Sequence, residues 1–488
     1  MNGLKRHVWG ILAVGIVFAA YAPSVRYSLV FDDTMLISEN PNMTWERIGV
    51  LLTSPFWQIE KDRVPLGKEN MGGMYRPVIS VISLVDKSVA HGEAWPFHLT
   101  NVLGHVACVG LVYLLLLGFL PVPWQAALMA LLWGLNPTHT EVVGFVSGRT
   151  DLFSSLFMLA ALLIYLNGRS ALLFGLMVLL AMGSKETSVC LLPLIVLMHL
   201  ARPMPWRRGH WVAGILVVTA YFIERHRALA AVPPVMPTDL AQAWRTAVIL
   251  PGLAVQHIAS LVVPWGVLAV APKISHDVTA LTFEWLGFAW MVFSSWRRPL
   301  RALGLAWALL FFLPTAFGAL QVYGGVDELV SKRFVSFAAI GIALWFGDYL
   351  FVDRALFAPP HPSRLAAVLL AAYATAFLVQ STWRDEVYLN EHQFWATMAR
   401  EFPDSDMVAY NYGLLLLGEG NCEASLVETR RSIANNPRYF QGNAFLNLSA
   451  CLARLGRRDE AVAALDEGLR YWPGSTQLRA SRQAYLAR

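Results

Sequence analysis

Charged residues are scarce in this chain. Of its 488 residues, 15% are charged and 56% are apolar or aromatic, whereas about 25% of an ordinary soluble domain is charged. This composition excludes a conventional soluble enzyme. The net charge of +5 does not indicate nucleic-acid binding, because the basic residues lie in short loops between apolar runs and not in one stripe. We therefore expect no nucleic-acid partner.

The chain also has few cysteines and no nucleotide-binding motif. The four cysteines include no C-x-x-C pair, which argues against a disulfide scaffold and against a structural zinc site. No P-loop is present, and no G-x-G-x-x-G follows a strand pattern. The sequence therefore offers no nucleotide-binding loop.

Apolar runs fill residues 1–382. The first run follows Lys5 and Arg6 and is long enough to cross a bilayer. Because no convincing cleavage site follows it, we interpret it as an uncleaved first helix that starts in the cytoplasm. Further runs lie at about 99–120, 124–146, 151–167, 170–183, 187–200, 209–223, 245–265, 283–296, 302–318, 334–350 and 365–381.

The basic loops set the expected number of crossings. They all fall in the cytoplasm if the run 245–265, which contains Pro251, does not cross the membrane. This predicts about eleven crossings and an external C-terminus. The alternative count of twelve places the C-terminus in the cytoplasm.

Two segments are polar enough to lie outside the membrane. Residues 26–97 form the longest polar stretch of the membrane half, and we expect a folded external loop with short amphipathic helices. From residue 383 onward charge increases, and Pro403, Pro437 and Pro473 are spaced by 34 and 36 residues, the period of tetratricopeptide repeats. The sequence thus predicts an all-α protein, with a polytopic membrane helix bundle at 1–382 and tetratricopeptide repeats at 383–488.

Two cysteines fall on adjacent helices of the predicted repeats. Cys422 and Cys451 could form a disulfide in an oxidising compartment, although cysteines of suitable spacing often miss the required geometry. The sequence leaves both a disulfide and two free thiols possible.

An acidic pair follows the first apolar helix. Asp32 and Asp33 lie between Phe31 and Leu36, and adjacent carboxylates beside a lipid surface are costly unless they are paired or used. One could act as a general base for an acceptor hydroxyl, while the other binds an acceptor amide or a cation. Capping of the helix that follows explains the pair equally well.

A second polar group shares one helix face. His98, Asn101 and His105 follow i, i+3, i+7 spacing. No third histidine or acidic residue is spaced to complete a zinc centre, so hydrogen bonding between helices is a stronger interpretation than metal binding.

A third polar group crowds the turn at residues 136–151. Arg149 is a residue type that binds phosphate through two hydrogen bonds, unless Asp151 neutralises it within the turn. Other charges expected at the external face are Lys185, Glu186, Glu328, Lys332 and Arg333. Because few charges lie at mid-depth, an outward-facing site for a lipid phosphate fits this distribution better than a transporter does.

These motifs resemble those of a known enzyme family. FDD at 31–33, YRP at 75–77, HLTNVLGH at 98–105, NPTHTEVVGFVSGRTDLFSSLF at 136–157 and SKE at 184–186 precede the predicted repeats. In kind and order they are similar to the transmembrane-and-tetratricopeptide O-mannosyltransferases and their bacterial relatives, which are glycosyltransferases of the GT-C class. The family's Glu-Arg pair near the penultimate helices is split here, since Glu328 and Arg333 are not adjacent.

The resemblance implies an inverting enzyme that transfers one sugar from a polyprenyl-phosphate donor to a protein hydroxyl on the extracytoplasmic side. It implies Asp32 as the general base and Asp33 as a second acidic residue. It also implies a donor phosphate and sugar site lined by Arg76, His98, Asn101, His139, Glu141, Arg149, Lys185, Glu186, Glu328 and Arg333. This scheme accommodates a divalent metal beside the acidic pair but does not require one, and no other cofactor is expected.

The expected partners are the lipid-linked donor, membrane lipids and an exported acceptor protein that docks on the repeats. We expect a bacterial inner membrane with the repeats in the periplasm, or an endoplasmic-reticulum membrane with lumenal repeats in a eukaryote. Three other interpretations stay open: a non-enzymatic scaffold whose repeats recruit partners, a flippase for lipid-linked sugars, and a transferase that modifies a glycan or a lipid.

Overall fold

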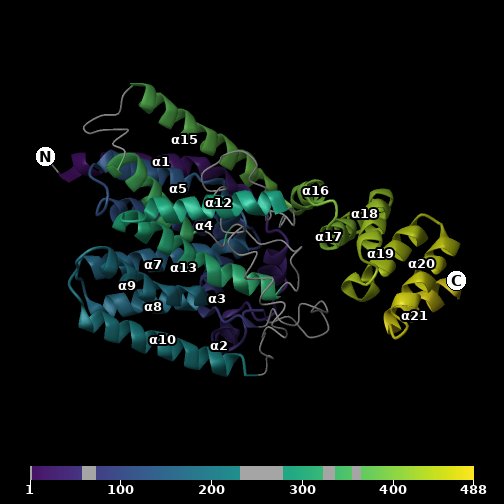
Figure 1. The fold of residues 1–488 in the computed structure, drawn as a ribbon. Coiled ribbons are helices and arrows are strands. Elements are labelled where there is room, and N and C mark those ends of the chain that lie inside the picture. The colour runs from purple at the N-terminus through teal and green to yellow at the C-terminus, as the bar shows by residue number, and fades with distance from the viewer. Residues whose placement is uncertain are drawn as a thin grey trace. The chain divides into compact units, whose positions relative to one another are not determined.

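The computed structural model describes residues 3–57, 73–230, 278–322, 333, 336–353 and 364–487, and every regular element among them is a helix (Figure 1). The predicted all-α class is therefore confirmed. The described residues form two compact units, of which the first ends at Leu389 and the second begins at Asn390.

The first unit contains the long helices of the chain. They are α1 (Gly3–Tyr21), α2 (Ile48–Thr53), α3 (Pro77–Ala90), α4 (Trp95–Leu116), α5 (Pro123–Gly134), α6 (Thr140–Val143), α7 (Arg149–Leu166), α8 (Ala171–Ser184), α9 (Leu191–Ala201), α10 (Arg208–Ala228), α12 (Val278–Ser295), α13 (Pro299–Val322), α14 (Ala338–Gly347) and α15 (Arg364–Asp385). Short 3-10 or π turns lie at Ala22–Arg26, Thr34–Ser38, Trp45–Arg47, Pro137–His139, Val146–Gly148, Glu186–Cys190, Asp348–Asp353 and Glu386–Tyr388.

The first unit is a membrane helix bundle. Among the described residues, three helical stretches are long and apolar enough to cross a bilayer, namely His7–Arg26, Trp95–Leu116 and Val146–Leu166, and shorter apolar helices accompany them. Large apolar side chains are exposed on α8, α10 and α12, which suits helices that contact lipid. The count of eleven or twelve crossings stays a prediction, and the run 245–265 lies outside the described residues.

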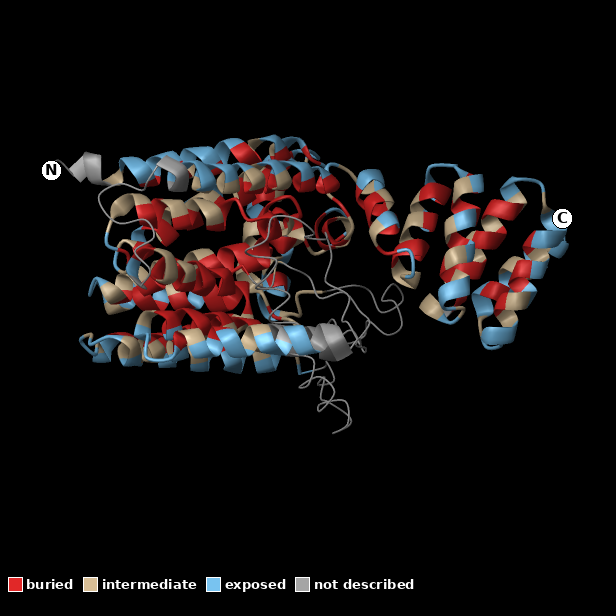
Figure 2. Ribbon diagram, turned by 45° about the horizontal axis from the view of Figure 1, so that its top comes forward, coloured by how far each residue is buried: buried red, intermediate tan, exposed pale blue. Residues whose placement is uncertain are grey.

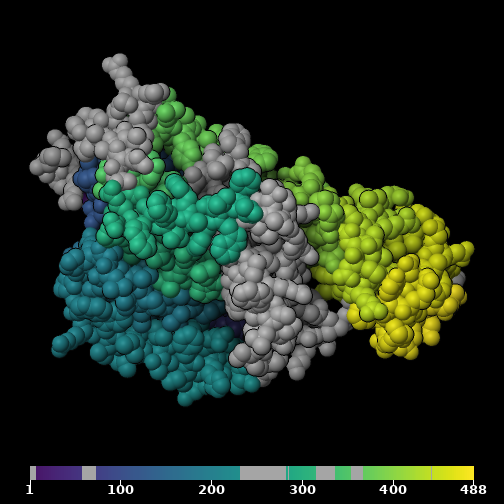
Figure 3. Space-filling model, in the orientation of Figure 1, coloured from purple at the N-terminus to yellow at the C-terminus, as the bar shows by residue number. Residues whose placement is uncertain are grey.

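Helix α4 lies at the centre of this bundle. It packs on α1, α3, α5 and α7, while α7 packs on α8 and α8 packs on α10. Figure 2 shows the buried residues gathered inside the bundle. Helices α8 to α10 and α12 to α13 form much of the surface seen in Figure 3. The segment 26–97 contains short helices among its described residues, and its assignment as an external loop stays a prediction.

The second unit consists of short helices packed in sequence. They are α16 (Glu391–Glu401), α17 (Asp406–Gly418), α18 (Cys422–Asn435), α19 (Asn443–Arg454), α20 (Arg458–Tyr471) and α21 (Thr476–Leu486), with a 3-10 turn at Tyr439–Gly442. Cys422 and Cys451 are free cysteines buried in the same core. The assignment of these helices to tetratricopeptide repeats, and of the first unit to a GT-C domain at 1–382, stays a prediction.

Helices α13 and α14 cross with their backbones in close contact. A Cβ atom on Gly304 would lie 2.5 Å from the carbonyl oxygen of Gly341, and one on Gly341 would lie 2.4 Å from that of Gly304. Neither helix can carry a side chain at the crossing. Small residues allow this approach in membrane bundles, where packing supplies much of the attraction between helices.

We expect Gly304→Ala to lower the unfolding temperature of the purified protein in detergent, because overpacking of this kind costs about 1–3 kcal/mol. Gly15→Ala is the matched control, since a Cβ atom there meets nothing within 4 Å and alanine favours a helix over glycine. Equal unfolding temperatures for the two variants would contradict the close crossing.

Candidate functional site

Asp33 links the loop after α1 to the turn that precedes α7 through hydrogen bonds. One carboxylate oxygen accepts hydrogen bonds from the backbone N–H and the hydroxyl of Ser147, at 2.6 and 2.5 Å. The other accepts from the backbone N–H groups of Val30 and Val146, at 3.3 and 3.2 Å. Asp33 is fully buried. Its side chain makes no capping bond to the helix that follows it, so the capping interpretation is wrong for Asp33.

The residue before the acidic pair has an unusual backbone conformation. Phe31 has a φ of 50°, in the left-handed region that bulky residues seldom adopt. Its ring stacks on Phe145 at a centroid distance of 6.5 Å, and Phe145 stacks on Tyr388 at 6.0 Å. Such strain persists only where surrounding contacts hold it. The stacked rings and the Asp33 bonds supply those contacts and fix the position of Asp32, which is buried.

The segment 136–151 folds as a series of tight turns. Asn136 begins it by accepting a hydrogen bond from the backbone N–H of Thr138 at 3.0 Å, and Pro137 suits the first turn of a helix. Gly148 is required near its end, because a Cβ atom there would lie 2.3 Å from the carbonyl oxygen of Glu141. The turns present successive polar side chains to different neighbouring helices.

Arg149 is held entirely by protein groups. Its guanidinium donates to the side chains of Asn101 and Ser83, at 3.1 and 3.0 Å, and to the backbone carbonyl of Phe97 at 2.9 Å. It also forms an ion pair of 2.8 Å with Asp86, and its side chain is 1% exposed. Asp86, and not Asp151, neutralises it, so neutralisation within the turn is wrong. Asp86 is not among the predicted site residues, although an acidic residue in the apolar stretch 77–90 is a signal in itself.

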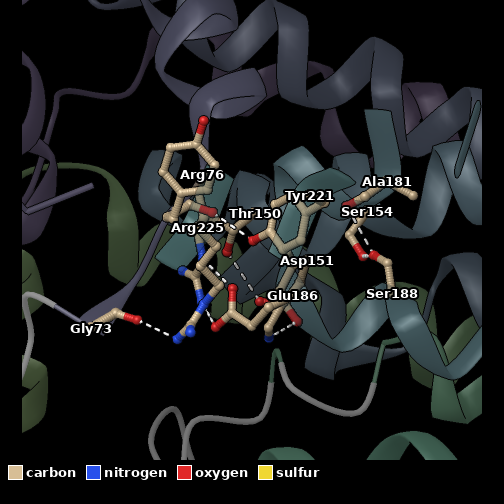
Figure 4. A network of polar contacts seen from close by, with 12 residues as sticks. Gly73, Arg76, Thr150, Asp151, Ser154, Ala181, Glu186, Ser188, Tyr221 and Arg225 are labelled. Atoms are coloured by element: carbon tan, nitrogen blue, oxygen red, sulfur yellow. Dashed lines mark hydrogen bonds and ion pairs between the residues drawn. The ribbon is translucent and has the colours of Figure 1, made fainter. Parts of the chain in front are cut away.

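A second network of charges includes Arg76, Glu186 and Asp151 (Figure 4). Arg76 donates two hydrogen bonds to the carboxylate of Glu186, at 3.2 and 3.1 Å, and Lys185 forms an ion pair with Asp151. The side chain of Glu186 is 28% exposed and that of Arg76 is 10% exposed. The Arg76–Glu186 pair is therefore more accessible than the Lys185–Asp151 pair, whose side chains are 5% and 9% exposed.

The three predicted histidines are buried. His105 hydrogen-bonds the carbonyl oxygen of Gly134 at 2.9 Å, and its ring centroid lies 5.2 Å from that of His139. His98 packs edge-on against Tyr27 at 6.2 Å. In the described part of the chain, no group of three His, Cys, Asp or Glu residues could hold a metal ion. These contacts agree with the interpretation of HLTNVLGH as a face that packs between helices.

Glu141 meets Arg333 from a distant part of the chain. A Glu141 carboxylate oxygen accepts a hydrogen bond from the backbone N–H of Arg333 at 3.0 Å, and the two side chains form an ion pair of 3.9 Å. The Arg333 guanidinium lies over the ring of Phe145, 5.4 Å from its centroid. Glu328 lies outside the described residues. The structure thus brings Arg333 to the segment 136–151.

The predicted site residues therefore surround one segment in several groups. Glu141, Ser147, Arg149 and Asp151 contact Arg333, Asp33, Asp86 and Lys185 in that order. Both oxygens of Asp33 already accept two hydrogen bonds each, so a divalent metal beside the acidic pair would have to compete with them. The roles of these residues in catalysis and donor binding stay predictions.

Curated relatives identify the kind of protein that this chain is similar to. Protein O-mannosyl-transferase TMTC3 of Homo sapiens is 26% identical over 255 residues, which are 52% of this chain and 25% of that protein. Protein O-mannosyl-transferase Tmtc1 of Drosophila melanogaster is 30% identical over 197 residues, 39% of this chain and 22% of that protein. The chain is homologous to these transferases.

This homology confirms the resemblance inferred from the motifs. The aligned part spans about a quarter of the length of these relatives. Protein O-mannosyl-transferase TMTC2 of Mus musculus is 26% identical over 161 residues, 32% of this chain and 18% of that protein. No family model matches the chain, and no solved structure matches it.

The protonation of Asp33 gives a test of its burial. Burial raises the pKa of Asp33 to about 6, against the hydrogen bonds from Ser147 and Val30, which lower it. The native state therefore holds this proton up to about pH 6, whereas the unfolded state releases it near the ordinary value of 3.8. The resulting stability is fully present below pH 3.8 and is lost as the pH rises through about 6.

We therefore expect the unfolding free energy of the wild type to fall by up to about 3 kcal/mol between pH 4 and pH 7 relative to Asp33→Asn. The variant cannot titrate at this position, so the difference between the two pH profiles isolates the group. Unfolding in detergent across this pH range measures it. Parallel profiles for the two proteins would contradict the burial of an ionisable Asp33.

We expect Asp86→Asn to destabilise the bundle by about 3–5 kcal/mol, because Arg149 would become a buried charge without a carboxylate. The measurement is the unfolding temperature in detergent. Replacing both partners, as in Asp86→Asn with Arg149→Met, should recover part of the loss. The control is Glu93→Gln at an exposed position. A double variant no more stable than Asp86→Asn would contradict the pairing.

Proposed function

We propose that the protein is a GT-C membrane glycosyltransferase, which transfers one sugar from a polyprenyl-phosphate donor to a hydroxyl group of an exported protein on the extracytoplasmic side. Homology to protein O-mannosyl-transferases supports the reaction class. The observation that carries the proposal is the attachment of the FDD loop, through Asp33, to the turn that leads into Arg149 and Asp151. This attachment joins a candidate base to a segment rich in ion pairs.

In this proposal Asp32 is the general base and Asp33 is its positioning residue. All four acceptor positions of Asp33 are occupied by Val30, Val146 and Ser147, so it has no capacity left to accept a substrate proton without losing a bond. Asp32 takes the proton of the acceptor hydroxyl as the oxygen attacks the anomeric carbon. The new bond is a glycosidic C–O bond, and the bond broken joins that carbon to the phosphate oxygen.

The leaving group is a lipid phosphate, whose negative charge needs nearby cations. Arg76 and Lys185 are assigned to it, with Glu186 and Asp151 orienting them through their ion pairs. Displacement in one step inverts the anomeric carbon, because no second carboxylate forms a covalent intermediate. Glu141, Glu328 and Arg333 complete the proposed lining of the donor site. The buried residues His98, Asn101, His139 and Arg149 are assigned to the frame that supports it.

The proposal extends to location and partners. The protein lies in a bacterial inner membrane with its C-terminal helices in the periplasm, or in the endoplasmic reticulum of a eukaryote with those helices in the lumen. The exported acceptor docks on the second unit, and the donor enters from the membrane. This location decides whether a bacterial or a eukaryotic host is used in each experiment.

The decisive experiment is intact mass spectrometry of exported proteins from wild-type, deletion and Asp32→Asn strains. We expect an exported protein to lose the mass of one sugar in both mutants, since removal of a general base costs at least roughly 100-fold in rate. Glu39→Gln is the matched control, because Glu39 lies in the same loop and is exposed.

Three outcomes would contradict the proposal. Full glycosylation in Asp32→Asn would reject Asp32 as the base. Unchanged exported proteins in the deletion strain would favour a glycan or lipid acceptor or a scaffold. Movement of labelled lipid between leaflets by reconstituted protein, without any modified acceptor, would favour a flippase. Membrane levels of each variant, measured by immunoblot, separate loss of activity from loss of protein.

A further inference from the structure

Helix α10 carries basic residues at the end that the predicted topology places outside the cytoplasm. Its last turn contains Arg225, His226 and Arg227, and this end lies beside Arg76 and Glu186, because Arg225 and Tyr221 bond to residues 73 and 75. In the predicted topology this face is extracytoplasmic, whereas basic loop residues favour the cytoplasm. The charge at this end of α10 therefore calls for a reason.

The geometry joins Arg225 to the network of Figure 4. Arg225 donates from Nη2 to the backbone carbonyl of Gly73 at 2.8 Å. One turn earlier, Tyr221 donates its hydroxyl hydrogen to the carbonyl of Tyr75 at 2.8 Å. The Tyr221 hydroxyl lies within electrostatic reach of Glu186, Arg76 and Arg225 together. Two guanidinium groups thus lie around one tyrosine.

The charges of this network do not cancel. Arg76 is paired with Glu186, Lys185 with Asp151, and the neighbouring Arg227 with Glu224 at 2.6 Å. Arg225 has no ion pair with an acidic residue in the described ranges, and its Nε atom is buried without a hydrogen-bond partner there. This buried N–H group without a partner lies on a side chain next to a partly exposed network, and the arginine leaves one positive charge for an incoming anion.

We propose that Arg225 is a further binding residue for the phosphate of the lipid-linked donor, acting together with Arg76. This inference rests on the proposed function and adds a residue outside the motifs that suggested it. The phosphate of a lipid-phosphate sugar is a diester with a single negative charge, and it matches the one positive charge that the ion pairs leave over. The Nε–H and Nη–H groups of arginine suit its oxygens.

The test measures the binding of farnesyl phosphate to the full-length protein in lipid nanodiscs by calorimetry at about pH 5, below the second phosphate pKa of about 6, where this monoester carries a single negative charge. We expect Arg225→Gln to weaken binding roughly 10- to 100-fold, as for loss of a hydrogen bond to a charged group. Arg227→Gln is the matched control on the same turn, with a side chain that is 69% exposed and paired with Glu224; its affinity should stay within about twofold of the wild type. Arg225→Lys should retain part of the affinity.

Each result decides a separate question. Equal affinities for Arg225→Gln and Arg227→Gln overturn the role of Arg225 and leave the transferase intact. Competition by inorganic phosphate at the concentration of farnesyl phosphate assigns the site to free phosphate and overturns the donor assignment. A wild type that glycosylates but does not bind farnesyl phosphate overturns this inference alone. A wild type that does neither removes the proposed function as well. If Arg225→Gln does not fold, Arg225→Lys carries the comparison.

Discussion

A carboxylate buried between two segments that are distant in sequence holds one end of the membrane bundle in a single arrangement. Asp33 accepts hydrogen bonds from its own loop at Val30 and from Val146 and Ser147, more than a hundred positions away. Unbonded donors in a buried turn would cost about 1–3 kcal/mol each, so the two segments depend on each other. The left-handed conformation of Phe31 is held by that attachment together with the stacking of its ring on Phe145. The position of Asp32 is fixed by the Asp33 hydrogen bonds and by the conformation of Phe31.

The segment after this attachment distributes charge among the helices. Arg149 pairs with Asp86 on α3, and Asp151, two residues later, pairs with Lys185 after α8. Buried ion pairs contribute little net stability, because desolvation offsets most of their attraction, yet losing one partner is costly. These pairs therefore match particular positions of α7 to α3 and to the turn after α8. A rigid frame of this kind can hold a reacting group in place.

The sequence predicted the parts of this structure that depend on local pattern. Apolar runs gave the all-α membrane bundle, and residue types in the motifs led to Asp33, Arg149 and Lys185. Partner choice was not predictable, because it depends on how α3 approaches α7: Asp151 is nearer to Arg149 in sequence, but Asp86 reaches it in space. Arg225 belongs to no motif. Its one sequence signal is that it lies on the predicted extracytoplasmic side, whereas basic loop residues favour the cytoplasm.

Arg149 and Arg76 are the same residue type but differ in how far their ion pairs are exposed to solvent. Arg149 is 1% exposed and its partner Asp86 is 7% exposed, so neither can exchange its partner for a substrate without opening the bundle. Arg76 is paired with Glu186, whose side chain is 28% exposed. In the proposed function, the donor phosphate approaches Arg76 from this accessible side while Glu186 keeps the guanidinium oriented. The buried pairs around Arg149 hold the helices that carry these residues.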